Sequence, residues 1–337
     1  MKTKAAVSLT VVAGSAVSAA LTYRAFRREM ERAETRISSG SKVITTSRGQ
    51  IEYASTGDGF PLLIIHGAGG GFDQLRGFES DTRLRSLGFR PIFVSRFGYL
   101  RTPLPADAST EAQVDAYAAL LDTLGIEQAG VVAISAGAPS GLRFAAKYPD
   151  KCAALALLVP AAYVPGSRTT APDAPPLMEL FRRTLLKSDF AFWLATKVAR
   201  GAMIENILGT PFDVAERASA TERRRLHDVL MDILPVSKRW AGLLNDVKVV
   251  THLEPANLPQ IKVPTLLVSA EDCLYGTFRS ARYLAEQIPG ARLVMYPDGG
   301  HLWVGHDAET QTVLTEFLQP LAGLIKESKG VPDYASL

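Results

Sequence analysis

After residue 41, short apolar runs alternate with segments of helical hydrophobic spacing. Two polar-apolar segments, 42–47 and 50–55, predict a hairpin around Arg48 and Gly49. Near-continuous apolar runs then predict strands that are buried on both faces of a parallel sheet. These runs are residues 62–65, 91–95, 129–134, 153–159, 265–269 and 292–296.

Four segments between the predicted strands carry apolar residues at helical spacing, namely 110–124, 137–147, 277–288 and 308–325. Strands alternating with helices indicate an α/β fold. Residues 163–259 interrupt this alternation with a proline-rich stretch, 165–176, followed by helical patterns, which predicts a helical lid or cap insertion. The predicted organisation is an N-terminal segment at 1–36, core at 42–162, insertion at 163–259, core at 260–326 and a loose tail at 327–337.

The N-terminal segment has the layout of a membrane-targeting sequence. Residues 5–23 are uncharged, with Lys2 and Lys4 before them and three arginines within the next five residues. Their number approaches the roughly 20 residues that a spanning helix needs, so we expect a single membrane anchor whose C-terminal flank, richer in arginine, is cytoplasmic. A cleaved signal, with small residues at 16–20 and a secreted or periplasmic product, is the alternative.

Composition excludes several classes of protein. The 337 residues are 47% hydrophobic and 21% charged, which excludes a disordered or collagen-like chain. Lys and Arg total 37 against 34 Asp and Glu, and without a basic stripe a dedicated nucleic-acid binder is not expected. Cys152 and Cys273 are interpreted as buried small hydrophobes, and the five histidines lack metal-ligand spacing, so no metal site is predicted.

The segment 131–137 reads Val-Val-Ala-Ile-Ser-Ala-Gly, an apolar strand followed by a small-x-Ser-x-Gly turn and a helix. Such a sharp turn requires small flanking residues and projects the serine hydroxyl above the sheet. The pattern predicts Ser135 as a nucleophile, although Ala133 replaces the usual first glycine. A small-residue turn without chemistry is the alternative interpretation.

A serine nucleophile needs a base and an orienting acid. Asp272 follows the strand at 265–269 and is the predicted catalytic acid, with Glu271 as the alternative. His301 follows the last strand and two glycines and is the predicted base, with His306 as the alternative.

The oxyanion of an acyl-transfer reaction needs hydrogen-bond donors. Residues 66–71 read His-Gly-Ala-Gly-Gly-Gly and expose backbone N–H groups after the first central strand. We expect the backbone N–H groups of Ala68 and Ala136 to be the donors. A phosphate-binding loop is disfavoured because the Lys-Ser/Thr ending of a P-loop is missing.

In this order, on these strand ends, the residues resemble the α/β-hydrolase superfamily over about residues 42–325. His66-Gly67, Arg96–Tyr99 and Tyr148-Pro149 add to the likeness, whereas Ala133 and Ala138 stand where glycine is frequent, and Ser269–Asp272 departs from Gly-x-x-Asp. The resemblance implies a mostly parallel central sheet with helices on both faces and a helical lid, and a reaction that needs no cofactor.

The function expected is a serine hydrolase that cleaves a carboxylic ester or related acyl compound of hydrophobic character through an acyl-enzyme. An apolar cluster in the insertion predicts substrate contacts at Phe181, Phe190 and Trp193, or packing of the lid on the sheet. The same triad also serves C–C bond hydrolysis, perhydrolysis and acyl transfer. A membrane-surface lipase and a non-catalytic, membrane-tethered binding module are further alternatives.

Overall fold

An eight-stranded β-sheet runs through the described part of the chain, which comprises residues 2–74, 79–166 and 186–328 of this computed structural model. The strand order is β1-β2-β4-β3-β5-β6-β7-β8. The first two pairings, β1 with β2 and β2 with β4, are antiparallel, and all the others are parallel. The predicted mostly parallel sheet is therefore confirmed. The strands are β1 (Lys42–Thr46), β2 (Gly49–Ser55), β3 (Phe60–Ile65), β4 (Phe89–Val94), β5 (Ala129–Ile134), β6 (Cys152–Leu158), β7 (Thr265–Ala270) and β8 (Arg292–Tyr296).

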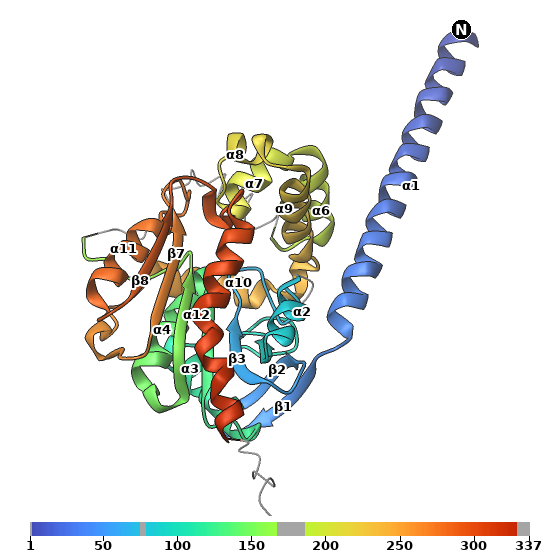
Figure 1. The fold of residues 1–337 in the computed structure, drawn as a ribbon. Helices are drawn as coiled ribbons and strands as arrows, with labels where there is room; N and C mark the ends of the chain where they lie inside the picture. The colour runs from blue at the N-terminus through green and yellow to red at the C-terminus, as the bar shows by residue number, and fades with distance from the viewer. Residues whose placement is uncertain (1, 75–78, 167–185, 329–337) are drawn as a thin grey trace, which may run out of the picture.

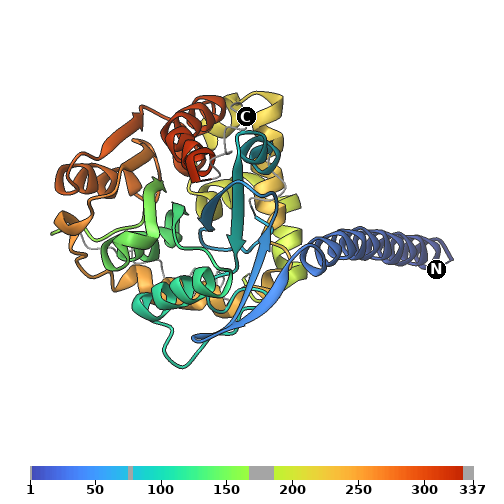
Figure 2. The ribbon, with the colours of Figure 1, turned by 60° about the horizontal axis from the view of Figure 1, so that its bottom comes forward.

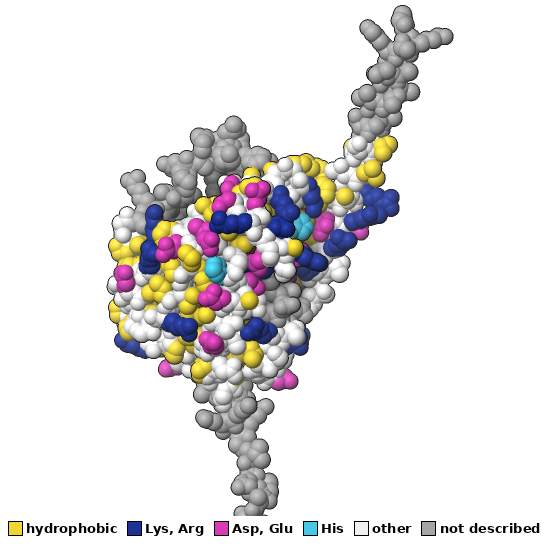
Figure 3. All heavy atoms as spheres, turned by 45° about the horizontal axis from the view of Figure 1, so that its top comes forward, with side chains coloured by type: hydrophobic (Ala, Val, Ile, Leu, Met, Phe, Trp, Pro, Cys, Tyr) yellow, Lys and Arg dark blue, Asp and Glu magenta, His cyan; other side chains and the backbone are white. Residues whose placement is uncertain are grey.

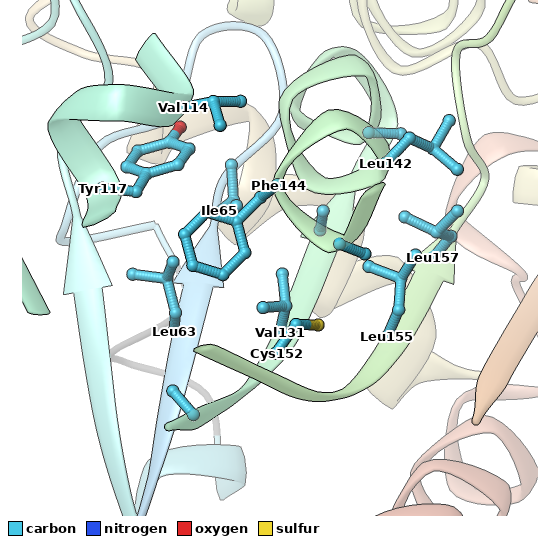
Figure 4. Close-up of a cluster of buried hydrophobic side chains, with 14 of the residues drawn as sticks. Leu63, Ile65, Val114, Tyr117, Val131, Leu142, Phe144, Cys152, Leu155 and Leu157 are labelled. Carbon is cyan, nitrogen blue, oxygen red and sulfur yellow. The ribbon is translucent and has the colours of Figure 1, made fainter. Parts of the chain in front are cut away.

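Helices cover both faces of the sheet, because successive side chains of a buried strand point to opposite sides. In β3, Leu63 and Ile65 join one apolar cluster, shown in Figure 4, whereas Leu62 and Ile64 join another. The first cluster packs under α3 (Thr110–Thr123), α4 (Ala138–Lys147) and α11 (Thr277–Gln287), and the second under α2 (Glu79–Ser86) and α12 (Asp307–Ser328).

A series of helices, here called the insertion, separates β6 from β7. Its described helices are α6 (Asp189–Val198), α7 (Arg200–Leu208), α8 (Phe212–Arg217), α9 (Ala220–Asp232) and α10 (Trp240–Thr251). Ser188 and Ser219 begin α6 and α9 as N-caps, because their side chains accept the N–H groups of Ala191 and Glu222. Most of the proline-rich stretch lies outside the described residues. The insertion has an apolar core of its own, distinct from the two cores that flank the sheet.

The N-terminal segment is part of one 37-residue helix, α1 (Lys2–Ser38), which projects from the domain in Figures 1 and 2. Its C-terminal part packs on the insertion. The ring of Phe26 lies 5.2 Å from that of Phe190 and 5.7 Å from that of Trp193, and Ala33 is buried. The second half of α1 is therefore anchored by packing on α6.

The membrane anchor predicted for residues 5–23 is wrong. None of the helices in the described ranges is both long and apolar enough to cross a membrane. Alanines and five serines and threonines keep the uncharged run weakly hydrophobic, and the helix continues beyond it into an arginine-rich segment. The membrane-associated localisation that was expected from this anchor is therefore also wrong.

Both signs of charge are interspersed on the face of the domain that Figure 3 shows. In Figure 3, Lys and Arg side chains alternate with Asp and Glu over the face turned towards the viewer. This mixture agrees with the net charge of +3.

Candidate active site

Ser135 lies in a strained turn between β5 and α4. It begins a short 3₁₀ helix, η1 (Ser135–Gly137). Its φ of 51° lies in the left-handed region, which residues other than glycine rarely adopt. A Cβ on Gly137 would lie 2.6 Å from the carbonyl oxygen of His66, so only glycine fits there. The predicted sharp turn with small neighbours is present, and the serine side chain stands at the carboxyl end of a central strand.

The imidazole of His301 contacts this serine. Its Nε2 lies 2.8 Å from Ser135 Oγ, and the His301 side chain is buried. His301 belongs to η5 (Gly300–Leu302), directly after β8. Gly300 has a φ of 64°, and a Cβ there would lie 2.6 Å from the Cα of Thr210, so the glycine lets the loop pack against the insertion.

The alternative base, His306, is engaged elsewhere. Its ring stacks on Tyr296 with centroids 4.2 Å apart, and its Nε2 lies 3.2 Å from a carboxylate oxygen of Asp298. Of the two histidines proposed from the sequence, the structure brings His301 to the serine.

Asp272 contacts the loop that carries His301. Its two carboxylate oxygens accept the backbone N–H groups of Gly299 at 3.1 Å and Gly300 at 2.7 Å. In the described part of the chain, no hydrogen bond joins Asp272 to the imidazole, which is the contact that the sequence predicted. The alternative acid, Glu271, is half-exposed and pairs with Arg282.

The other ring nitrogen of His301 faces a cysteine. Nδ1 lies 3.3 Å from Sγ of Cys273, which also accepts the hydroxyl of Thr277 at 3.1 Å. The sequence interpretation of Cys273 as only a buried small hydrophobe missed this contact. The feature of the sequence that could have pointed to Cys273 is its position, directly after Asp272 and close to the end of a predicted parallel strand.

The segment after β3 lies beside the nucleophile. A Cβ on Gly67 would be 3.2 Å from that of Ser135. The carbonyl oxygen of Gly67 accepts hydrogen bonds from Arg96 Nη2 at 3.1 Å and from His66 Nδ1 at 2.6 Å. This carbonyl and the N–H of Ala68 belong to the same planar trans peptide and point in opposite directions. The hydrogen bonds that hold the carbonyl therefore also fix the direction of the Ala68 N–H. Within the described residues, no acceptor takes the Ala68 N–H.

His66 is a neutral structural residue. Its Nε2 accepts the backbone N–H of Arg96 at 3.0 Å, so Nδ1 carries the proton that it donates to Gly67. Burial, and then the charge of Arg96, hold the pKa of His66 well below its usual range. The ring therefore stays uncharged while it holds the loop.

Arg96 ties this loop to the insertion. Its two terminal nitrogens each lie 2.6 Å from a carboxylate oxygen of Asp246 on α10, and one of them also donates to the carbonyl of Ala136 at 3.4 Å. Both Arg96 and Asp246 are buried. A paired, buried guanidinium thus contacts both segments that carry the predicted oxyanion donors.

A second buried arginine, Arg239, holds the same loop from the other side. It donates to the carbonyl of Gly70 at 2.5 Å and to both carboxylate oxygens of Asp73 at 3.1 and 2.7 Å. Arg36 of α1 adds a bond of 2.9 Å to Asp73. Burial alone raises the pKa of Asp73, but the two arginines outweigh it, so the pKa lies below its usual range.

Comparisons with known proteins agree with this geometry. Residues 61–206 match the family model described as the alpha/beta hydrolase fold. An uncharacterized hydrolase of Bacillus subtilis, YcgS, is 28% identical over 82% of this chain and 98% of its own length. A solved structure, an alpha/beta hydrolase fold protein from Nakamurella multipartita, has a TM-score of 0.63 at 27% identity and covers 84% of this chain and 99% of its own.

The chain has the α/β-hydrolase fold. It is a hydrolase of this fold. A further relative, the 2-hydroxymuconate semialdehyde hydrolase of a Pseudomonas species, is 26% identical over 78% of this chain and 88% of its own length.

Phe190 and Trp193, two of the substrate-binding residues predicted from the sequence, pack against α1. The rings of Phe190 and Trp193 contact Phe26 of α1 and each other. Among the described residues, no ring contact joins them to His301. Phe181 lies outside the described residues. The contacts of Phe190 and Trp193 agree with the packing interpretation, with α1 rather than the sheet as the partner.

Two further apolar side chains contact residues of the candidate site. The ring of Tyr275 meets that of His301 edge to face, with centroids 4.9 Å apart, and half of its side chain is exposed. Ile233 faces Gly69 of the predicted oxyanion loop, residues 66–71, where an added Cβ would lie 3.4 Å from the Ile233 side chain. The sequence interpretation missed both, because they follow from the placement of the insertion and not from any local motif.

Proposed function

We propose that this hydrolase cleaves a carboxylic ester, or a related acyl compound with a hydrophobic group, through an acyl-enzyme. The observation that carries the proposal is the 2.8 Å contact between His301 Nε2 and Ser135 Oγ. A serine hydroxyl is a weak nucleophile until a base accepts its proton, and this is the arrangement that activates it.

In the first half of the reaction, Ser135 Oγ attacks the carbonyl carbon while its proton passes to His301 Nε2. The negative oxygen of the tetrahedral intermediate accepts the N–H groups of Ala68 and Ala136, each of which is worth about 3 kcal/mol in comparable sites. The imidazolium then gives its proton to the leaving alcohol. In the second half, His301 activates a water that releases the acid from Ser135.

Asp272 contributes in this proposal by holding the loop that presents His301. Its two bonds to consecutive glycine N–H groups fix the backbone on which the imidazole is mounted. The side chain of Tyr275 supports a hydrophobic substrate, because it presents apolar surface beside the imidazole of His301.

A second candidate is hydrolysis of a C–C bond. The observation that favours it is the relative named as a 2-hydroxymuconate semialdehyde hydrolase, which matches most of this chain. The same serine and histidine serve both reactions, so the fold alone does not choose between them.

The test is labelling of the full chain with a fluorophosphonate probe, followed by turnover of p-nitrophenyl esters of increasing acyl length. We expect Ser135→Ala to abolish both labelling and turnover while its melting temperature stays near that of the wild type. Ser86→Ala, which changes an exposed serine of α2, is the matched control and retains both. Absence of labelling in folded wild-type protein would overturn the proposal. Faster Ser135-dependent turnover of 2-hydroxymuconate semialdehyde than of any ester would replace it with the C–C candidate.

A further inference from the structure

We propose that Cys273 is the positioning residue that orients the imidazole of His301, so that the relay in this hydrolase runs from serine through histidine to sulfur. This inference rests on the proposed function. The sequence reading gave the same task to Asp272, the neighbouring residue.

The first step is the tautomer of His301. For Nε2 to accept the proton of Ser135, the neutral ring must carry its own proton on Nδ1, which then donates. The atom that faces Nδ1, at 3.3 Å, is Sγ of Cys273. The contact is shielded from water, because Cys273 is 3% and His301 7% exposed.

The second step concerns the groups around Sγ of Cys273, which favour its role as a hydrogen-bond acceptor. Thr277 donates its hydroxyl to Sγ at 3.1 Å, and the hydroxyl of Ser269 lies 3.1 Å behind Thr277. All three of these side chains are buried. With Nδ1 of His301, two hydrogen-bond donors converge on one sulfur atom, and hydrogen bonds to the charged form favour a thiolate.

Electrostatics agree with this geometry. Burial raises the pKa of Cys273, but once His301 is protonated, its charge and the hydrogen bonds from His301 and Thr277 outweigh burial and lower that pKa to about 7. His301 is the titratable group that acts on the sulfur. The other cysteine shows the contrast, because burial raises the pKa of Cys152 to about 12.

The third step is the position of Asp272. Both oxygens of its carboxylate already accept backbone N–H groups, from Gly299 and Gly300. Adjacent residues at the end of β7 thereby divide two tasks. Asp272 holds the loop, and Cys273 holds the ring.

The proton balance needs no additional reactant. When Ser135 attacks, its proton moves to Nε2, and the imidazolium keeps its Nδ1 proton in the hydrogen bond to the thiolate. The negative sulfur stabilises this cation, as a carboxylate does in a Ser-His-Asp relay. The Nε2 proton then passes to the leaving group, and the sulfur ends the cycle as it began.

The experiment compares Cys273→Ala, Cys273→Asp and Asp272→Asn in the full chain, with Cys152→Ala as the control for loss of a buried sulfur away from the site. We expect Cys273→Ala to lower kcat on the order of 10²- to 10³-fold, the contribution of a base that is no longer oriented, with little change in KM. Cys273→Asp restores at least a tenth of wild-type kcat, because a carboxylate again faces Nδ1.

The pH profile separates an orienting role from a packing role. The low-pH limb of the kcat/KM profile belongs to the coupled pair of Cys273 and His301, because Nε2 must be unprotonated to accept the proton of Ser135. In Cys273→Ala this limb moves to lower pH, because the protonated imidazole loses the negative sulfur that stabilises it. Cys152→Ala leaves the profile in place. Cys273→Ser, the smallest change, replaces Cys273→Ala if the latter does not fold, and the same loss of kcat is expected.

A Cys273→Ala variant with kcat within twofold of wild type and an unmoved pH profile would overturn the inference, as would loss of activity in Asp272→Asn with an unaltered fold and no loss in Cys273→Ala. In both cases Ser135-dependent labelling of the wild type still supports the proposed function. A folded wild type that the probe does not label overturns both.

Discussion

The methyl group of Ala133 on β5 faces the backbone of Gly141 on α4. A Cβ on Gly141 would lie 2.7 Å from the Cβ of Ala133, closer than two such carbons approach. Ala133 stands where related turns often have glycine. Because β5 carries a methyl group at this position, α4 must have glycine opposite it, and this glycine allows the strand and the helix that flank Ser135 to pack closely.

Gly141→Ala should therefore destabilise the protein although alanine favours helices. The clash costs about 1–3 kcal/mol, and the better helix propensity returns at most about 1 kcal/mol. Adding Ala133→Gly should recover most of the loss, which denaturant unfolding of the single and double variants measures. Simple additivity of the two changes would show that the residues do not compete for space.

Replacement of Arg96 by methionine should cost about 3–5 kcal/mol of unfolding free energy, because it leaves Asp246 as an unpaired buried charge. The double variant Arg96→Met, Asp246→Leu should recover much of this stability. Its ester turnover should remain low, because the carbonyl of Gly67 has lost one of the donors that aim the Ala68 N–H. Recovery of stability and activity together would mean that Arg96 serves only to neutralise Asp246.

Asp232 should make the protein less stable as pH rises. Burial, only partly offset by Arg36, raises the pKa of Asp232 to about 6. An acid whose pKa is raised in the folded state contributes stability at low pH that is lost as pH increases through that pKa. Relative to wild type, Asp232→Asn should therefore gain about 2 kcal/mol between about pH 4.5 and about pH 7.5, at about 1.4 kcal/mol for each pH unit of separation. A constant difference across this range would contradict the prediction.

Phe26→Ala should loosen α1 from the domain. The loss of two aromatic contacts, with Phe190 and Trp193, is expected to lower the unfolding free energy by about 1–2 kcal/mol. Leu21→Ala, on the same helix at a residue that is 62% exposed, is the matched control and should change it by less than about 0.5 kcal/mol. Equal effects of the two changes would show that Phe26 contributes no more than an exposed residue of the helix.

Much of the fold could be predicted because its core strands are short apolar runs with clear ends. The predicted ranges of β5 and β8 agree with the structure at both ends, and β7 extends one residue further. The helix α2 was not predicted. Its sequence, Glu79–Ser86, is mostly polar, and Leu84 is the one apolar side chain that it contributes to the core.

The candidate site was predictable where chemistry is local in sequence. Ser135 was predicted from a strand followed by a small-x-Ser-x-Gly turn, and His301 from the last strand and the two glycines after it, with His306 as the alternative. The contact of Arg96 with Asp246 joins residues 150 apart in the chain, and the choice between Asp272 and Cys273 depends on which side chain faces Nδ1. These contacts depend on how helices and loops are placed in three dimensions, and hydrophobic periodicity does not predict that placement.

The salt bridges of Asp73 restrict which parts of this enzyme can be exchanged. Asp73 lies after the oxyanion loop, Arg239 belongs to the insertion and Arg36 to α1, so three segments distant in the chain share one carboxylate. A chimera that takes its insertion from another hydrolase would lose Arg239 and leave a buried anion underpaired beside the oxyanion loop. Changes of specificity by recombination should therefore carry all three residues as one unit, or replace Asp73 at the same time.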